Sequence, residues 1–96
     1  MAPTCSNAIV SGYVRDKTNN LPIEGVRVWL TELNGQQNSS EWTTGSDGWY
    51  MVTTFVCASK DMYLKANKLN YRKYSNLVTV QAGVTLSKNI KMAVRC

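Results

Sequence analysis

Apolar side chains recur along this chain with a period of two, in short runs separated by residues that favour turns. The run at residues 10–15 is the clearest, because Val10 and Val14 alternate with Tyr13 and Arg15. Neighbouring side chains of a strand point to opposite faces, so this alternation is typical of a strand with one buried face. No stretch keeps the 3.6-residue period of a helix for three turns. The pattern predicts an all-β protein.

Six further runs complete this pattern. They lie at residues 26–31, 41–45, 49–52 and 62–67, in a stretch that ends at Val80, and at residues 86–92. Seven short strands at intervals of about 8 to 12 residues predict a sandwich of two sheets, because a single open sheet could not bury so many apolar faces. We therefore expect a seven-stranded, two-sheet β-sandwich that forms one domain over residues 1–96.

Turn residues separate the runs. The segment 46–48, Ser-Asp-Gly, predicts a tight hairpin turn between the third and fourth strands. Asp16 and Asp47 both fall in turns, where an Asp carboxylate usually accepts hydrogen bonds from its own backbone. Four turn positions are expected to need a positive φ or a close backbone approach, which glycine or asparagine tolerates: Gly25, Gly48, Asn70 and Gly83.

Five short motifs follow one another along almost the whole chain from Val10 to Met92. They are the segments 10–16, 21–30, 44–50, 68–71 and 78–83, in which valines and other apolar residues alternate around Gly, Pro or Asp turns. In their order and spacing they resemble the motifs of carboxypeptidase regulatory-like, or transthyretin-like, domains. The resemblance implies an Ig-like or prealbumin-like Greek-key sandwich. It also implies an accessory module that spaces, rigidifies or docks neighbouring domains of a larger protein.

The chain departs from related patterns at a few positions. Gly45 stands where the family commonly has Asp, so the contacts of that carboxylate are lost here. Isopeptide-forming pilin and adhesin domains share the sandwich, but they require a Lys in the first strand, an Asn or Asp in the last and an acid between them. Asn89 could be the acceptor, whereas the first strand offers Arg15 and no lysine, and Ala66 stands where the acid is expected. We therefore expect no isopeptide cross-link.

The charge is unevenly distributed. The net charge is +5, and residues 59–96 hold eight basic side chains and a single acidic one, Asp61. Such a surface attracts anionic partners, although lysines that alternate along a strand also form an ordinary solvated face. No apolar run has the roughly 18 residues that a membrane span needs, so no membrane span is expected.

The chain has three cysteines, Cys5, Cys57 and Cys96. One disulfide plus one further thiol would suit an oxidising compartment, and Asn38 begins a glycosylation sequon in a loop-like segment. Both features favour an extracellular or cell-envelope location, whereas three reduced thiols would suit the cytosol. The spacing does not decide which pair is bonded.

The residues that most enzymes use are scarce in this chain. It has no histidine, six carboxylates, no C-x-x-C pair and no glycine-rich phosphate-binding motif. We therefore expect no catalytic residue, no metal site and no cofactor. Basic residues interleave with aromatic ones, but no RNP-like or helix-turn-helix motif accompanies them, so nucleic acid is not an expected partner.

Aromatic side chains are the candidate binding residues. The alternation places them opposite the valine and leucine faces, or, for one, in the short third strand: Tyr13, Trp29, Trp42, Trp49 and Tyr63. Exposed indole rings can cover the apolar face of a sugar, whereas cross-strand aromatic pairs also simply stabilise sheets or meet a neighbouring domain. Two functions stay open: a structural or docking module that contacts neighbouring domains or another protein, and a polysaccharide-binding module. In the second case an anionic polymer is favoured by basic residues near Tyr63 and Tyr71: Lys65, Lys68, Arg72 and Lys73.

Overall fold

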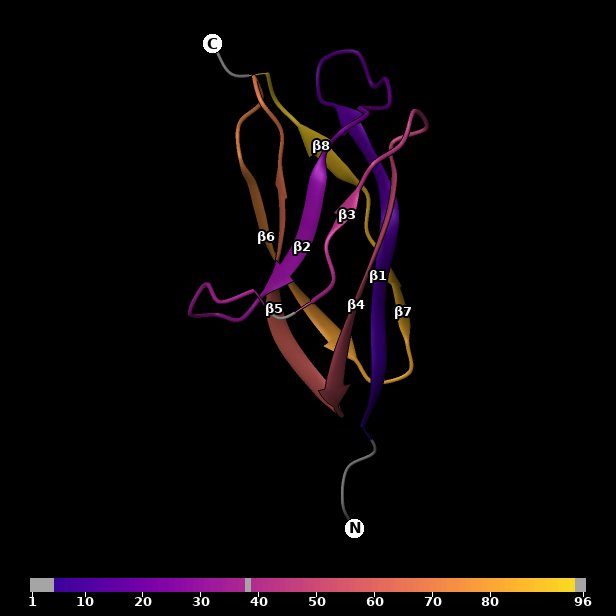
Figure 1. The fold of residues 1–96 in the computed structure, drawn as a ribbon, viewed down its shortest axis with the longest axis vertical. Coiled ribbons are helices and arrows are strands. Elements are labelled where there is room, and N and C mark those ends of the chain that lie inside the picture. The colour runs from indigo at the N-terminus through magenta and orange to yellow at the C-terminus, as the bar shows by residue number, and fades with distance from the viewer. Residues whose placement is uncertain (1–4, 38, 95–96) are drawn as a thin grey trace.

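The computed structural model describes residues 5–37 and 39–94, which form eight β-strands (Figure 1). The strands are β1 (Cys5–Asp16), β2 (Arg27–Thr31), β3 (Trp42–Thr43), β4 (Trp49–Cys57), β5 (Ser59–Asn67), β6 (Tyr74–Gln81), β7 (Thr85–Ser87) and β8 (Ile90–Met92). Among these described residues, no helix is long and apolar enough to cross a membrane.

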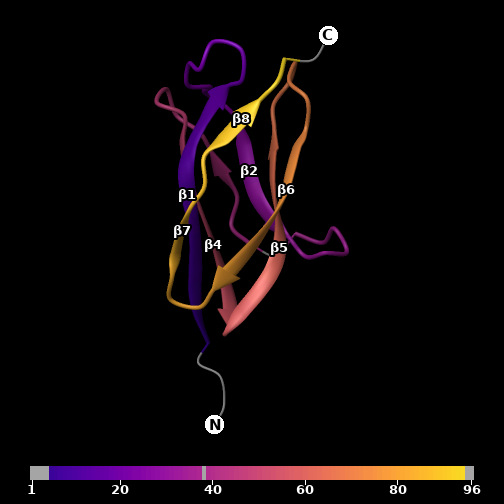
Figure 2. The same cartoon turned by 180° about the vertical axis from the view of Figure 1, so that it is seen from behind.

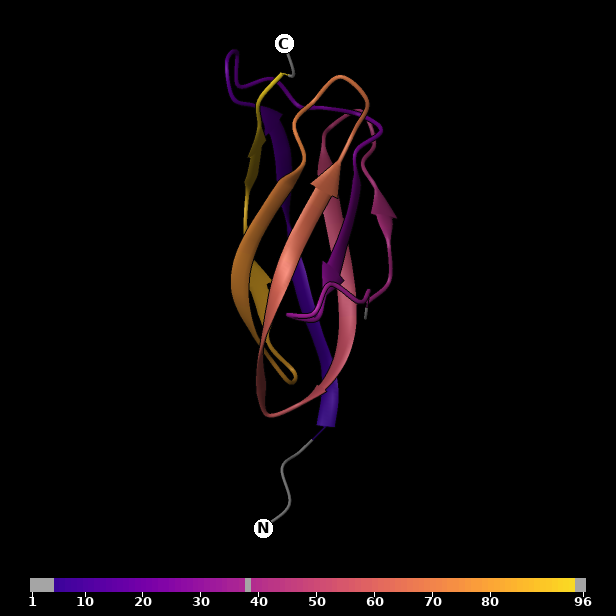
Figure 3. The same ribbon diagram turned by 90° about the vertical axis from the view of Figure 1, so that its left-hand side faces the viewer.

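The strands form two sheets that pack face to face, as the alternation predicts. One sheet has the order β4-β1-β7, with β8 also paired to β1, and the other has the order β3-β2-β5-β6. Figure 3 looks onto the second sheet, with β1 behind it. The predicted two-sheet β-sandwich is therefore confirmed.

The last predicted strand is interrupted rather than missing. β7 and β8 both run parallel to β1 and keep the same register, with Ser11 opposite Ser87 and Val14 opposite Ile90. Between them, the Asn89 side-chain oxygen replaces a backbone acceptor and takes the hydrogen bond of the Tyr13 N–H at 3.1 Å. The Lys88 carbonyl oxygen accepts a hydrogen bond from the hydroxyl of buried Tyr50. The eight strands thus correspond to the seven expected.

Each sheet contributes its inward-facing side chains to one core. Val28 and Leu30 of β2, and Met62 and Leu64 of β5, are fully buried, whereas the intervening Trp29 is half-buried on the outer face. Tyr50 and Val52 of β4 meet them from the other sheet. The predicted inner and outer faces of these strands are therefore confirmed.

The predicted hairpin between the third and fourth strands is wrong. The Gly48 N–H does donate to the Gly45 carbonyl at 2.9 Å, so the turn exists. β3, however, pairs with β2, while β4 pairs with β1 along nine positions from Tyr13–Trp49 to Cys5–Cys57. The chain crosses from one sheet to the other at this turn, and again at Gly83 between β6 and β7. A turn signal alone does not distinguish a hairpin from such a crossing.

Cys5 and Cys57 form a disulfide that joins the beginning of β1 to the end of β4. The ladder places these two residues directly opposite each other, which decides the pairing that the sequence left open. Cys96 and the sequon residue Asn38 lie outside the described residues.

Candidate functional site

The predicted aromatic residues do not form one platform. Trp29 and Tyr63 lie on the outer face of the sheet β3-β2-β5-β6, in adjacent cross-strand rows with Lys65 and Thr31 as their partners. Tyr13 and Trp49 are partners on the outer face of the other sheet. The five side chains are therefore divided between opposite faces of the sandwich, with Trp42 at an edge.

Trp42 and Trp49 close one edge of the sandwich. Their rings meet edge to face, with centroids 5.3 Å apart and an interplanar angle of 89°. The Trp42 indole N–H donates to the Trp49 carbonyl oxygen at 3.0 Å, and the Trp42 ring packs against the core. Because β3 and β4 belong to different sheets, this pair links the two layers. Both indoles are half-buried and are engaged in this packing contact.

Tyr13 lies next to Trp49 and is 40% exposed. The Arg15 guanidinium lies over its ring, 5.4 Å from the centroid, because residues two apart on a strand share a face. This face of the sheet also carries Phe55, which is 65% exposed.

Trp29 borders a shallow hollow of about 270 Å³ on the other face. Lys65, its cross-strand partner, lies beside it, and the remaining lining comes from β5, from the residue before β6 and from the start of β6: Ala66, Asn67, Lys73, Tyr74 and Ser75. The indole is half-buried, so one part of it is held by the sheet while another part borders the hollow.

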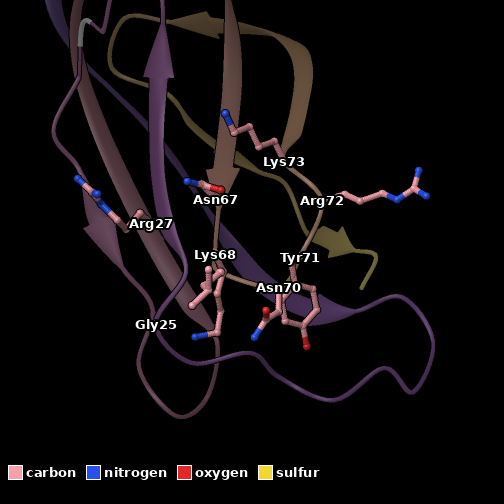
Figure 4. Close-up of a pocket in the computed structure, with 9 residues that line it drawn as sticks. Gly25, Arg27, Asn67, Lys68, Asn70, Tyr71, Arg72 and Lys73 are labelled. Carbon is pink, nitrogen blue, oxygen red and sulfur yellow. The ribbon is translucent and has the colours of Figure 1, made fainter. Parts of the chain in front are cut away.

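A second, larger hollow of about 940 Å³ adjoins the first and shares Asn67 and Lys73 with it. Its other lining residues include Arg27 and Lys68, and Arg27 forms an ion pair with Glu41 at 2.5 Å. Figure 4 shows the side chains of Arg27, Asn67, Lys68 and Lys73 on one side of the loop between β5 and β6, while Arg72 extends away on the other side. The hollow is therefore strongly basic.

The sequence singled out Lys65, Lys68 and Lys73 but not Arg27. Arg27 belongs with them because β2 and β5 pair with Arg27 opposite Asn67. This register follows from long-range pairing, which the local pattern does not contain. The alternation did indicate that Arg27 and Trp29 share an outward face.

The predicted turn residues have the following conformations. Gly25, Gly48, Asn70 and Gly83 have φ values of 81°, 76°, 73° and 77°. At Gly48 a Cβ atom would lie 2.5 Å from the Val14 carbonyl oxygen, so the close approach to β1 also requires glycine. The Asp47 carboxylate accepts the Trp49 N–H at 3.1 Å.

Asp16 connects the end of β1 to the loop between β5 and β6. Its carboxylate accepts the Thr18 N–H at 2.7 Å and the Tyr71 hydroxyl at 3.0 Å. The Thr18 hydrogen bond is the main reason why the pKa of Asp16 lies below its usual value; desolvation opposes it, and the Tyr71 hydrogen bond lowers the pKa further. The hydrogen bond to Asp16 is also the main reason why the pKa of Tyr71 is raised. In the described part of the chain, no group of three or more His, Cys, Asp or Glu side chains is arranged to hold a metal ion.

The comparisons with known proteins agree with this architecture. The family model of the carboxypeptidase regulatory-like domain matches residues 9–93. The chain belongs to this family. The motifs that suggested it, from Val10 to Met92, fall inside the matched segment. The chain is therefore a regulatory-like β-sandwich, a type that serves as an accessory or structural module.

Similar folds occur in proteins with different functions. The chain is 17% identical to GBS52, a minor pilin of Streptococcus agalactiae. The structural match covers 100% of this chain and 47% of that one, with a TM-score of 0.67. The chain is also 17% identical to the pilus 2b backbone protein of group B streptococcus. That match covers 91% of this chain and 41% of that one, with a TM-score of 0.66. Catechol 1,2-dioxygenase of Acinetobacter radioresistens is 11% identical, over 97% of this chain and 53% of that one, with a TM-score of 0.70.

At these identities the similarity shows the fold alone. The chain spans about half the length of the structures it matches. No curated protein sequence matches it. What the pilins assemble and what the dioxygenases catalyse therefore belong to those proteins.

Proposed function

We propose that this domain is a non-catalytic structural and docking module of a longer extracellular or cell-envelope protein, in which it holds neighbouring domains apart. The observation that carries this proposal is the parallel pairing of the first strand with the last. Because β1 and β8 run in the same direction, the chain enters at one end of the molecule and leaves at the other (Figures 1 and 2). The molecule measures 51 × 25 × 17 Å, and this elongated shape supports a spacer role.

Contacts between distant segments near both ends of the long axis support this role. The Cys5–Cys57 disulfide ties β1 to β4 where the described chain begins. The Asp16–Tyr71 hydrogen bond and the Tyr71–Val94 bridge tie the opposite end. A module held at both ends resists bending and local unfolding between its neighbours. The disulfide also favours an oxidising compartment, which is why we place the parent protein outside the cytosol.

Two folded reporter domains fused to the two ends of this chain test the spacer role. Their separation is measured as a distance distribution, for example by pulsed electron resonance between spin labels on the reporters. The matched control replaces the domain with a Gly/Ser linker of 96 residues. Such a linker has a root-mean-square span of about 55 Å, close to the length of the domain, so the width of the distribution decides and its mean does not.

We expect a narrow distribution for the domain and a broad one for the linker. A distribution as broad as that of the linker would overturn the spacer proposal. The non-catalytic part is tested separately, by incubating the purified domain with ester, peptide, glycoside and catechol substrates. Turnover that survives repurification and disappears on unfolding would contradict it.

A further inference from the structure

We propose that the outer face of β2, β5 and the start of β6 is a binding surface for a linear anionic polysaccharide whose sugar rings carry carboxylates. We call this surface the Trp29 face and define it by Arg27, Trp29, Lys65, Asn67, Lys68 and Lys73. It goes beyond the spacer role, because a spacer needs no ligand. A polymer bound along its side would anchor the module between its neighbours.

The sheet register assembles the surface. Cross-strand partners lie side by side on one face, so Arg27 lies beside Asn67, and Trp29 lies beside Lys65, which is followed by Ser75 on β6. The next row brings Thr31, Tyr63 and Leu77 together. Successive rows on one face are separated by two residues along each strand, a distance of about 7 Å. The hollows of about 940 and 270 Å³ follow two of these rows and share Asn67 and Lys73.

The charge of the surface is largely uncompensated. Arg27 is paired with Glu41, and the other ion pair between described residues, Lys60–Glu32, lies outside the Trp29 face. Lys65, Lys68 and Lys73 therefore have no carboxylate within ion-pair distance among the described residues, and the Lys65 ammonium lies 5.9 Å from the Tyr63 ring centroid. Three such cations around the two adjoining hollows create a potential that attracts a polyanion.

The aromatic and amide groups favour a sugar over an acidic peptide. The Trp29 indole is half-buried and lines a shallow hollow, and an indole ring is a flat apolar surface. One face of a pyranose ring presents C–H groups that pack on such a surface, while its hydroxyls need donors and acceptors at the rim. Asn67 and Ser75 supply them, and Lys65 and Lys73 are placed to bind a ring carboxylate. An acidic peptide would use the lysines but has no comparable use for the indole.

Isothermal titration of the purified domain with a homogalacturonate oligomer tests the proposal. The same oligomer with its carboxyls methyl-esterified removes the charge but keeps the rings, and poly-L-glutamate of similar length keeps the charge but removes the rings. We expect saturable binding to the homogalacturonate that weakens as salt is raised. We expect much weaker binding to the other two probes.

Variants locate the binding on the Trp29 face. Trp29→Ala is expected to weaken binding about tenfold or more, as loss of a central aromatic contact does. The double variant Lys65→Gln/Lys73→Gln is expected to weaken binding several-fold and to reduce its salt dependence. Phe55→Ala and Lys91→Gln are the matched controls: Phe55 and Lys91 are exposed on the other sheet, and binding should not change. The lysine variants change exposed or half-exposed side chains, so they remain informative if Trp29→Ala does not fold.

Three outcomes would overturn the inference. The first is no binding to homogalacturonate, and the second is binding that Phe55→Ala and Lys91→Gln weaken as much as the Trp29-face variants do. The third is binding to poly-L-glutamate as tight as to homogalacturonate, which would assign the surface to an acidic polypeptide. None of these outcomes affects the spacer proposal, whose test measures the distance between fused reporters.

Discussion

The hydroxyl of Tyr71 donates a hydrogen bond to the carboxylate of Asp16 at 3.0 Å, although the two residues are 55 positions apart in the chain. Asp16 ends β1 in one sheet, and Tyr71 lies in the loop that joins β5 to β6 in the other. The bond therefore ties the two sheets together at the end of the molecule where β8 finishes. Asp16 also accepts the Thr18 N–H, so one carboxylate organises both its own turn and this contact.

The Asp16 contact predicts a specific dependence of stability on pH. The pKa of Asp16 is lowered in the folded protein by the Thr18 and Tyr71 hydrogen bonds. Its stabilising contribution is therefore present above the unfolded pKa, about 3.9, and is lost as the pH falls through the lower folded pKa. The pKa of Tyr71 is raised, so its contribution is present below the usual tyrosine pKa and is lost as the pH rises through the raised value.

Urea unfolding of the wild type, Asp16→Asn and Tyr71→Phe over a range of pH checks this prediction. At neutral pH both variants should be less stable than the wild type. The difference between wild type and Asp16→Asn should shrink as the pH falls below the unfolded value of about 3.9 and through the lower folded pKa of Asp16, because the wild-type carboxylate then becomes protonated. A difference that stays constant over the whole acid range would show that the charge of Asp16 contributes nothing.

The Cys5–Cys57 disulfide should contribute strongly to stability. It joins residues 52 positions apart, and closing a loop of this length stabilises a protein by about 2–4 kcal/mol through the unfolded state. Cys5→Ala/Cys57→Ala should therefore lower the free energy of unfolding by that amount, measured by denaturant titration. Wild-type protein in reducing agent should lose as much, and the double variant should not respond to reductant. A response of the double variant would point to another bond.

Gly12 allows a close backbone approach between β1 and the chain that joins β7 to β8. A Cβ atom there would lie 2.2 Å from the Lys88 carbonyl oxygen, which is backbone and cannot move aside cheaply. Gly12→Ala should lower the free energy of unfolding by about 1–3 kcal/mol. Gly45→Ala is the matched control, because its Cβ would meet only Asp47 Oδ1 at 3.7 Å, an ordinary contact. Equal effects in thermal unfolding would contradict the importance of this approach.

Two buried threonines should respond oppositely to the same substitution. Thr44 Oγ1 accepts the Val26 N–H at 2.9 Å and donates to the Ile23 carbonyl at 2.7 Å, so Thr44→Val leaves both groups unpaired and should cost about 1–3 kcal/mol. Thr31 Oγ1 is buried without a hydrogen-bond partner among the described residues. Thr31→Val should therefore be neutral or stabilising by up to about 1 kcal/mol. Denaturant titration compares the two, and a loss in both would contradict the assignment.

The candidate site illustrates how far local patterns reach. Alternation correctly placed Trp29 and Tyr63 on the outer faces of their strands, because the direction of a side chain depends on its position along the strand. It did not indicate that Tyr13 and Trp49 lie on the opposite face of the molecule. It also missed Arg27, whose place beside Asn67 depends on the pairing of β2 with β5.

The sequence by itself determined the strand positions, their buried faces and the family, since each depends on residues close together along the chain. The tertiary structure decided which strands and which cysteines pair with one another. β3 and β4, separated by a tight turn, joined different sheets, and Cys57 met Cys5 because β4 pairs with β1 over its whole length. A period of two specifies which face of a strand is buried but not which strand lies beside it. That choice is made by packing between distant segments, when both sheets bury their apolar faces in one core.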